Sequence, residues 1–113
     1  MPPRVELLFW DGCPSHPRAL ADLRDALADT GLDPEAVILI EVPDDATAAR
    51  EGFTGSPTIR IDGADVVPTP DEPLQLACRV YRRRDGRISP VPDPDDLRDA
   101  LRRAATTPEG ATP

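Results

Sequence analysis

The chain has 113 residues, which suits one domain around one modest hydrophobic core. Its net charge of −8 argues against a nucleic-acid binder, and all 13 basic residues are arginine, which excludes chemistry that needs a lysine. No apolar run approaches the roughly 20 residues that a membrane span needs. The first residues carry no secretory segment, so we expect a cytoplasmic protein whose two cysteines do not form a structural disulfide.

The first half of the chain predicts a strand, a helix and a second strand. Residues 5–10 are mostly apolar, as in a central strand covered on both faces. Leucines and alanines over 19–27 form the stripe of an amphipathic helix, with Pro14 at its first position. The apolar, β-branched run 36–42 is typical of a buried parallel strand. Together these segments predict a βαβ unit.

The second half predicts a short helix, a β-hairpin and a final helix. The alanines within 44–52 favour a helix, and Asp62-Gly63 is a strong signal for the turn of a hairpin. Asp93 is an N-cap candidate for a last amphipathic helix with acidic residues in its first turn. We expect one domain over residues 1–105 and a disordered tail over 106–113.

A further strand is predicted over residues 74–82, which carry the second cysteine. Their alternation places Leu74, Leu76, Cys78 and Val80 on one apolar face. Cys78 is therefore expected to be a small buried hydrophobe. The functional alternative makes it a distant resolving thiol or the second soft ligand of a metal ion.

The first chemical motif is Phe9-Trp10-Asp11-Gly12-Cys13-Pro14-Ser15-His16, at the junction of the first strand and the first helix. Amides at a helix N-terminus stabilise a thiolate and turn the thiol into a nucleophile. His16 follows Cys13 by one helical turn, so its imidazolium could lower the thiol pKa, or its neutral ring could accept the proton. The alternative is an inert core cysteine beside a surface histidine.

The second motif is Gly55-Ser56-Pro57-Thr58, at the start of a predicted strand. A proline in this position after a small polar residue is a candidate for a cis peptide bond. The alternative is an ordinary trans proline at a strand start.

In this order and at this spacing, the two motifs resemble the thioredoxin-like superfamily, in which a cis-proline loop faces a nucleophilic cysteine. The resemblance implies an α/β fold with a mixed sheet of four to five strands flanked by helices. It implies that Cys13 attacks, with Trp10 and Pro14 beside the substrate. It also implies that Ser56, before Pro57, offers backbone groups that pair with substrate as a short antiparallel strand.

The chain departs from the usual Cys-x-x-Cys motif of that superfamily, because His16 stands where the resolving cysteine would be. What remains is a single-thiol site that forms and releases mixed disulfides with protein cysteines or low-molecular-weight thiols. We therefore predict a redox-active cysteine that performs thiol-disulfide exchange, as an oxidoreductase or thiol transferase, without a cofactor. The chain has no C-x-x-C knuckle, so the sequence does not predict a zinc site.

Two other functions stay open. One is a thioredoxin-like module that binds a protein without turnover. The other follows from a looser similarity, over roughly residues 5–103, to short thioredoxin-like proteins grouped beside organomercurial lyases. In those lyases two cysteines grip mercury and an aspartate delivers a proton, so the similarity implies roles for Cys13, Cys78 and Asp11.

Overall fold

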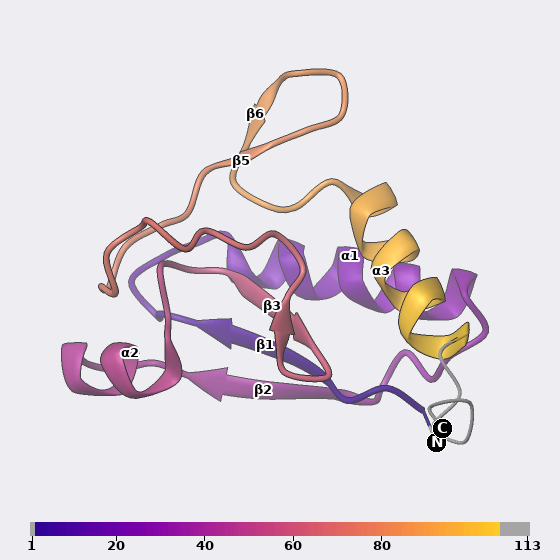
Figure 1. Ribbon diagram of the computed structural model, residues 1–113, viewed down its shortest axis with the longest axis horizontal. Coiled ribbons are helices and arrows are strands. Elements are labelled where there is room, and N and C mark those ends of the chain that lie inside the picture. Colours follow the sequence, from indigo (N-terminus) through magenta and orange to yellow (C-terminus); the bar gives the residue numbers. More distant parts are fainter. Residues whose placement is uncertain (1, 107–113) are drawn as a thin grey trace.

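The computed structural model describes residues 2–106, which form a four-stranded sheet, a separate two-stranded hairpin and three helices (Figure 1). In chain order the elements are β1 (Val5–Phe9), α1 (His16–Asp29), β2 (Val37–Glu41), α2 (Asp45–Glu51), β3 (Thr58–Ile61), β4 (Ala64–Asp65), β5 (Tyr81–Arg82), β6 (Ile88–Ser89) and α3 (Pro94–Thr106).

The main sheet is mixed, with the strand order β2-β1-β3-β4. Strand β1 pairs in parallel with β2 and antiparallel with β3, so that Leu7 lies between Leu39 and Ile59. A tight turn at Asp62-Gly63, where both residues have positive φ, joins β3 to β4. The α/β class and the four-stranded mixed sheet predicted from the sequence are confirmed.

The larger core lies between one face of this sheet and helices α1 and α3, which pack side by side (Figure 1). The apolar stripe predicted for the first helix is confirmed, since Leu23 and Leu27 are buried. The stripe of the last helix is confirmed by Leu97 and Leu101. Burial of this stripe holds each helix against the sheet, because it removes a continuous apolar surface from water.

A smaller core lies on the other face, where Phe53 and Leu8 pack with α2. The buried carboxylate of Glu6 shares this face and pairs with Arg60 at 3.1 Å. Arg60 in turn pairs with Glu51 at 3.0 Å, which links the end of α2 to β3. The guanidinium of Arg60 therefore balances the negative charge that Glu6 carries inside the protein.

The prediction of a fully buried strand over 36–42 is wrong. Strand β2 is parallel as predicted, but it is an edge strand, and Ile38 and Leu39 are 40% and 51% exposed. An apolar β-branched run predicts strand formation, whereas burial depends on how many elements cover the strand.

The prediction for residues 74–82 is also wrong in its extent and in its buried face. Only Tyr81–Arg82 form a strand, and the residues that are buried are Arg79 and Tyr81. Val80 is 69% exposed and Cys78 is exposed. The face that points inward carries the polar side chains of Arg79 and Tyr81. Both are buried because each has a polar partner inside the protein, namely Asp65 and the Pro57 carbonyl. We call residues 74–80 the strap.

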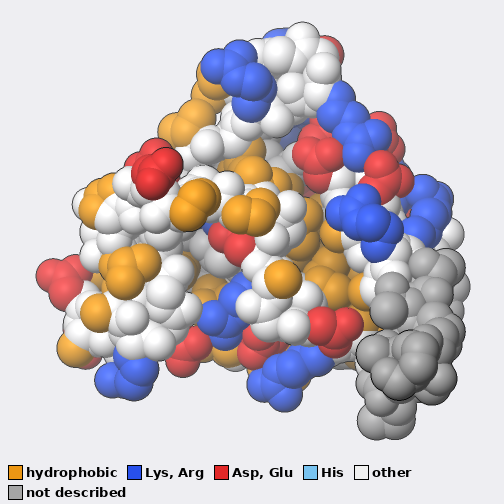
Figure 2. Space-filling view, in the orientation of Figure 1, with side chains coloured by type: hydrophobic (Ala, Val, Ile, Leu, Met, Phe, Trp, Pro, Cys, Tyr) orange, Lys and Arg blue, Asp and Glu red, His pale blue; other side chains and the backbone are white. Residues whose placement is uncertain are grey.

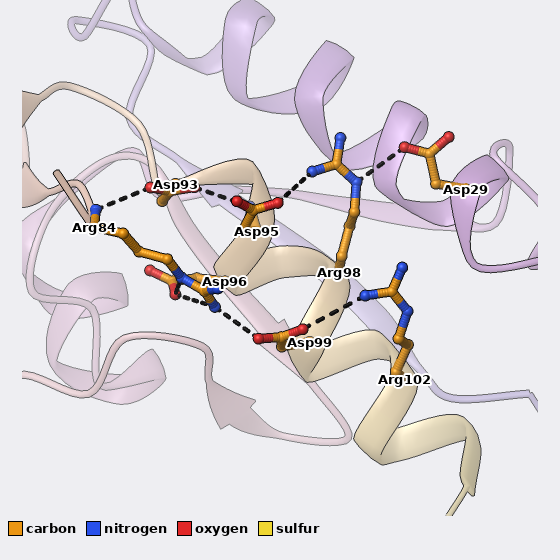
Figure 3. A network of polar contacts seen from close by, with 8 residues as sticks. All are labelled: Asp29, Arg84, Asp93, Asp95, Asp96, Arg98, Asp99 and Arg102. Carbon is orange, nitrogen blue, oxygen red and sulfur yellow. Dashed lines mark hydrogen bonds and ion pairs between the residues drawn. The ribbon is translucent and has the colours of Figure 1, made fainter.

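The β5–β6 hairpin is tied to the helices by surface ion pairs (Figure 3). The Arg84 guanidinium contacts Asp96 at 2.8 Å and Asp99 at 2.7 Å at the start of α3. On the same helix, Arg98 contacts Asp29 of α1 at 2.9 Å. Figure 2 shows acidic and basic side chains interleaved over this part of the surface. These ion pairs hold the β5–β6 hairpin, which directly follows the strap, against the start of α3.

The predicted cap of the last helix is confirmed, because the Asp93 carboxylate accepts a hydrogen bond from the Asp95 amide at 2.9 Å. The predicted boundary at residue 105 falls within α3, which continues to Thr106. The rest of the predicted tail, 107–113, lies outside the described residues. None of the helices formed by residues 2–106 combines the length and apolar composition needed to cross a bilayer.

Candidate dithiol site

Cys13 lies in the turn between β1 and α1, and its side chain is 0% exposed. Its backbone N–H donates to the Trp10 carbonyl at 2.9 Å. Helix α1 begins later than predicted, at His16 with Ser15 as its N-cap, so Pro14 precedes the helix. Cys13 is therefore held by a turn that leads into the helix rather than by the helix itself.

Trp10 and Pro14, the two predicted substrate contacts beside Cys13, have different environments. The indole of Trp10 is half-buried against the smaller core and lies so close over Gly12 that a Cβ there would overlap it. Pro14 is exposed. Trp10 therefore shapes the Cys13 turn by packing, while Pro14 borders it at the surface.

The cis-proline loop faces Cys13, as the sequence predicted. The Ser56–Pro57 peptide bond is cis. The Cys13 thiol donates to the Ser56 carbonyl oxygen at 3.5 Å, which brings two motifs together that are separated by 43 positions in the chain. The buried Ser56 hydroxyl has no hydrogen-bond partner of ordinary geometry within residues 2–106.

The backbone of Ser56 is already paired with the strap. Its N–H donates to the Ala77 carbonyl at 2.7 Å, and its carbonyl accepts from the Arg79 N–H at 2.8 Å. The two segments form a parallel bridge with Ser56 opposite Cys78. The backbone groups that the resemblance assigns to substrate are therefore occupied by the protein's own chain.

Gly55 allows this close approach of the strap. Its φ of +146° is a backbone conformation that residues other than glycine rarely adopt. A Cβ at this position would lie 2.5 Å from Cγ of Arg79 and 3.2 Å from the Ala77 carbonyl oxygen. The glycine of the second motif thus serves the contact with the strap.

Two buried side chains anchor the strap. The Arg79 guanidinium pairs with Asp65 at 2.8 Å and donates to the Thr58 hydroxyl at 3.1 Å and to the Val67 carbonyl at 2.6 Å. It also lies over the ring of Tyr81, 4.5 Å from the ring centre. The Tyr81 hydroxyl donates to the carbonyl of Pro57, on the cis-proline loop. Because Arg79 and Tyr81 point inward, the alternating backbone directs Cys78 to the other side.

The strap brings Cys78 next to Ser56 and so to Cys13, close enough for each thiol to shift the pKa of the other, and the two are not joined in a disulfide. The prediction that Cys78 is buried on an apolar face is wrong. The alternative, a distant resolving thiol or the second soft ligand of a metal ion, stays a prediction, and it needs the proximity to Cys13 that the structure has. The position of Cys78 depends on pairing with Ser56, which no local sequence pattern encodes.

The pKa values of the two thiols move in opposite directions. Burial raises the pKa of Cys13, but hydrogen bonds from Cys78, from the amide and hydroxyl of Ser15 and from the Ser56 side chain outweigh burial and lower it overall. The hydrogen bond to Cys13, followed by burial and the negative charge on Cys13, raises the pKa of Cys78 to about 11. Cys13 is therefore the thiol of the pair that loses its proton first, and Cys78 is the one that keeps its proton longer.

His16 contacts the backbone of this turn. Its Nδ1 lies 3.0 Å from the Cys13 carbonyl oxygen, and its ring stacks on Phe9 with the ring centres 4.5 Å apart. The donors that lower the pKa of Cys13 belong to other residues. The structure thus gives His16 contacts that hold the turn, and its predicted effect on the Cys13 thiol stays a prediction.

The residues of a soft-metal site are only partly brought together. Cys13 and Cys78 meet, while the side chain of Asp11 is exposed in the turn before Cys13. Within the part of the chain that the structure describes, no three His, Cys, Asp or Glu side chains are close enough to hold a metal ion.

Sequence reasoning missed Arg79, Tyr81 and Gly55 as residues of the site. A faint signal exists, since an arginine interrupts an otherwise apolar stretch directly after Cys78. An arginine at such a position is buried only with a partner, and the partner, Asp65, is 14 residues away.

Comparison with known proteins finds no relative: no family model, curated protein or solved structure matches the chain. The functional proposal therefore rests on the geometry of the two thiols.

Proposed function

We propose that the protein is a thioredoxin-like thiol-disulfide oxidoreductase whose redox couple is Cys13–Cys78. The observation that carries this proposal is that two free thiols meet at Ser56, since the Cys13 thiol donates to its carbonyl at 3.5 Å and Cys78 lies opposite it in the β-bridge. Their contact displaces the two thiol pKa values in opposite directions. A stabilised thiolate beside a protonated thiol is the arrangement in which one sulfur attacks or leaves while the other supplies or receives the proton.

The architecture supports the thioredoxin-like part of the proposal. A parallel β1–β2 pair, an antiparallel β3–β4 pair and the sheet order β2-β1-β3-β4 agree with the plan that the two motifs suggested. The position of the cis-proline loop against the Cys13 thiol agrees with it too. A reducing compartment such as the cytoplasm would keep both thiols ready to react.

The chemistry transfers two electrons. When the dithiol reduces a disulfide, the Cys13–Cys78 bond forms, the substrate's sulfur–sulfur bond breaks, and two thiols are released. In the reverse direction a substrate thiolate attacks the accessible Cys78 sulfur and Cys13 leaves as a thiolate. Cys13 is the better leaving group of the pair, because a lower pKa speeds departure.

Mass mapping of the oxidised protein tests this proposal. Trypsin cleaves after arginine, so Cys13 falls on the peptide 5–18 and Cys78 on the peptide 61–79. After equilibration with oxidised dithiothreitol we expect these two peptides to be joined within one chain and lighter by two hydrogens. The matched Cys78→Ser variant gives no such product. Two cysteines that remain separately alkylated under these conditions would contradict the redox couple.

Capture of a soft metal ion is a second candidate, favoured by the meeting of two sulfurs at the end of a strap. With no third ligand among residues 2–106, such a site suits an ion that accepts two sulfurs, as soft thiolate-binding metals do. One equivalent of mercuric ion should then protect both cysteines from alkylation in the wild type. A protein that binds the ion but does not close the disulfide would be a binding module.

A further inference from the structure

The two thiols differ in how an external molecule can reach them. Cys13 has no exposed surface, because the cis-proline loop and the strap cover its sulfur. Cys78 is exposed. A disulfide from solution therefore meets Cys78 in the observed structure, whereas it meets Cys13 only after the strap has left Ser56.

The strap also closes the site to an extended polypeptide. Both backbone groups of Ser56 are paired with Ala77 and Arg79, so they are unable to pair with a substrate strand. What the strap leaves open is a cavity of about 280 Å³ beside Cys78. This volume lies near the lower end of the roughly 300–1,000 Å³ of ligand pockets, which suits a small molecule.

The cavity is polar, and its unpaired charge is negative. Its lining includes the side chains of Thr54, Thr69, Glu72 and Gln75, together with Cys78. Arg79 also borders it, but its guanidinium is engaged by Asp65 and Val67 and is buried. The Glu72 carboxylate makes no ion pair within residues 2–106, and the chain as a whole carries −8. These charges favour a ligand with an ammonium group and disfavour one with carboxylates.

We propose that this cavity binds a small disulfide that carries an ammonium group, and that exchange with it begins at Cys78. The proposal rests on the proposed function and adds to it the class of substrate and the order in which the two cysteines react. It reverses the order expected from the sequence, in which Cys13 attacks first.

The reaction balances in two steps. Cys78 gives its proton to the Cys13 thiolate and attacks one sulfur of the small disulfide, which forms a mixed disulfide on Cys78 and releases one small thiolate. Cys13 gives that proton to the released thiolate and attacks the Cys78 sulfur. The second small thiolate leaves, and the Cys13–Cys78 bond remains. The protein loses two electrons, and the small disulfide gains them.

A pair of matched probes tests the preference for the ammonium group. Cystamine and bis(2-hydroxyethyl) disulfide have the same chain length, with an ammonium in one and a hydroxyl in the other. The measured quantity is the rate at which each forms a mixed disulfide on Cys78 of the Cys13→Ser variant, divided by its rate with N-acetylcysteine. We expect cystamine to be favoured about threefold to fivefold after this correction, the size of one exposed ion pair.

Two further substitutions decide whether the cavity is responsible. Glu72→Gln in the same background should remove the preference, and Asp71→Asn, an exposed neighbour outside the cavity lining, should leave it in place. A preference that is absent from the start, or that survives Glu72→Gln, would overturn the assignment of the substrate class.

The order of reaction has its own readout. In the Cys78→Ser variant the remaining thiol is buried, so we expect trapping of cystamine on Cys13 to be about tenfold slower than trapping on Cys78. Equal or faster trapping on Cys13 would overturn the order. The wild-type protein could then still close its disulfide with oxidised dithiothreitol, so failure of this inference is distinguishable from failure of the redox couple.

Discussion

The two segments that carry the cysteines are held in different ways. The Cys13 turn lies between a central strand and a helix that packs on the main core, and it is fixed by backbone geometry and by the packing of Trp10. The strap has little regular structure, and Arg79, Tyr81 and the pairing with Ser56 hold it. The dithiol thus joins a rigid element to one that depends on a few side chains. Changes to those side chains should alter the site while the sheet and helices persist.

Loss of the Arg79 anchor should have the largest effect on the strap. Arg79→Ala removes a buried guanidinium and leaves Asp65 without its partner, which we expect to lower the free energy of unfolding by about 3 kcal/mol. Urea denaturation measures it. The control Arg82→Ala, at an exposed residue three positions along, should cost less than about 0.5 kcal/mol. Equal losses in the two variants would mean that Arg79 is no special anchor.

Gly55→Ala should separate the strap from the cis-proline loop. The new Cβ would overlap Cγ of Arg79, and the residue would keep an unfavourable φ, so we expect a loss of about 2 kcal/mol. Gly63→Ala is the matched control, because it also has a positive φ but no atom within 4 Å of the added Cβ. We expect about 1 kcal/mol there. Alkylation of Cys13 should become faster in the Gly55 variant only; unchanged protection would show that the strap is not held at this contact.

Tyr81→Phe should loosen the same contact more gently. The substitution keeps the buried ring beneath Arg79 but removes the hydroxyl that donates to Pro57. We expect a loss of about 1 kcal/mol, the usual value of one buried hydrogen bond. Thermal unfolding and the alkylation rate of Cys13 should both change in the direction seen for Gly55→Ala, by less. A free energy of unfolding equal to that of the wild type would show that the Tyr81 hydroxyl does not help to hold the strap.

The raised pKa of Cys78 also predicts a dependence of stability on alkaline pH. The folded protein raises the pKa of Cys78 to about 11, so it favours the protonated thiol. This contribution is fully present below the unfolded pKa of roughly 8.5 and is lost as pH rises towards the folded value. The free energy of unfolding should therefore fall over that window, and fall less in Cys78→Ser. The same slope in both proteins would assign the dependence to other groups, such as the buried Tyr81 hydroxyl, whose pKa is also raised.

The parts that sequence reasoning predicted well are those with local signals. The leucine stripe of α1, the Asp62-Gly63 turn, and the proline after Ser56 each depend on residues a few positions apart. The prediction for the strap was wrong because distant partners decide which of its side chains are buried. Arg79 is buried against Asp65, and Tyr81 against Pro57.

The candidate site divides in the same way. The motif around Cys13 and the cis-proline loop were found in the sequence, and the structure brings them together. The contact between Cys13 and Cys78 spans 65 positions and follows from a β-bridge that pairs irregular chain with Ser56. No periodicity in the sequence encodes such a bridge, so the contact between the two cysteines is visible only in the three-dimensional structure.

The central claim is that Cys13 and Cys78 act as one pair, and the ultraviolet absorbance of thiolate against pH tests it most directly. We predict two separated steps in the reduced protein: one thiolate forms below the ordinary thiol range, and the second forms only near pH 11. Cys78→Ala should raise the pKa of the step that remains, because Cys13 loses the hydrogen bond from Cys78, and His16→Ala should change it less. Two overlapping steps at the pKa of an ordinary thiol, unaltered by Cys78→Ala, would contradict the pairing of the two thiols.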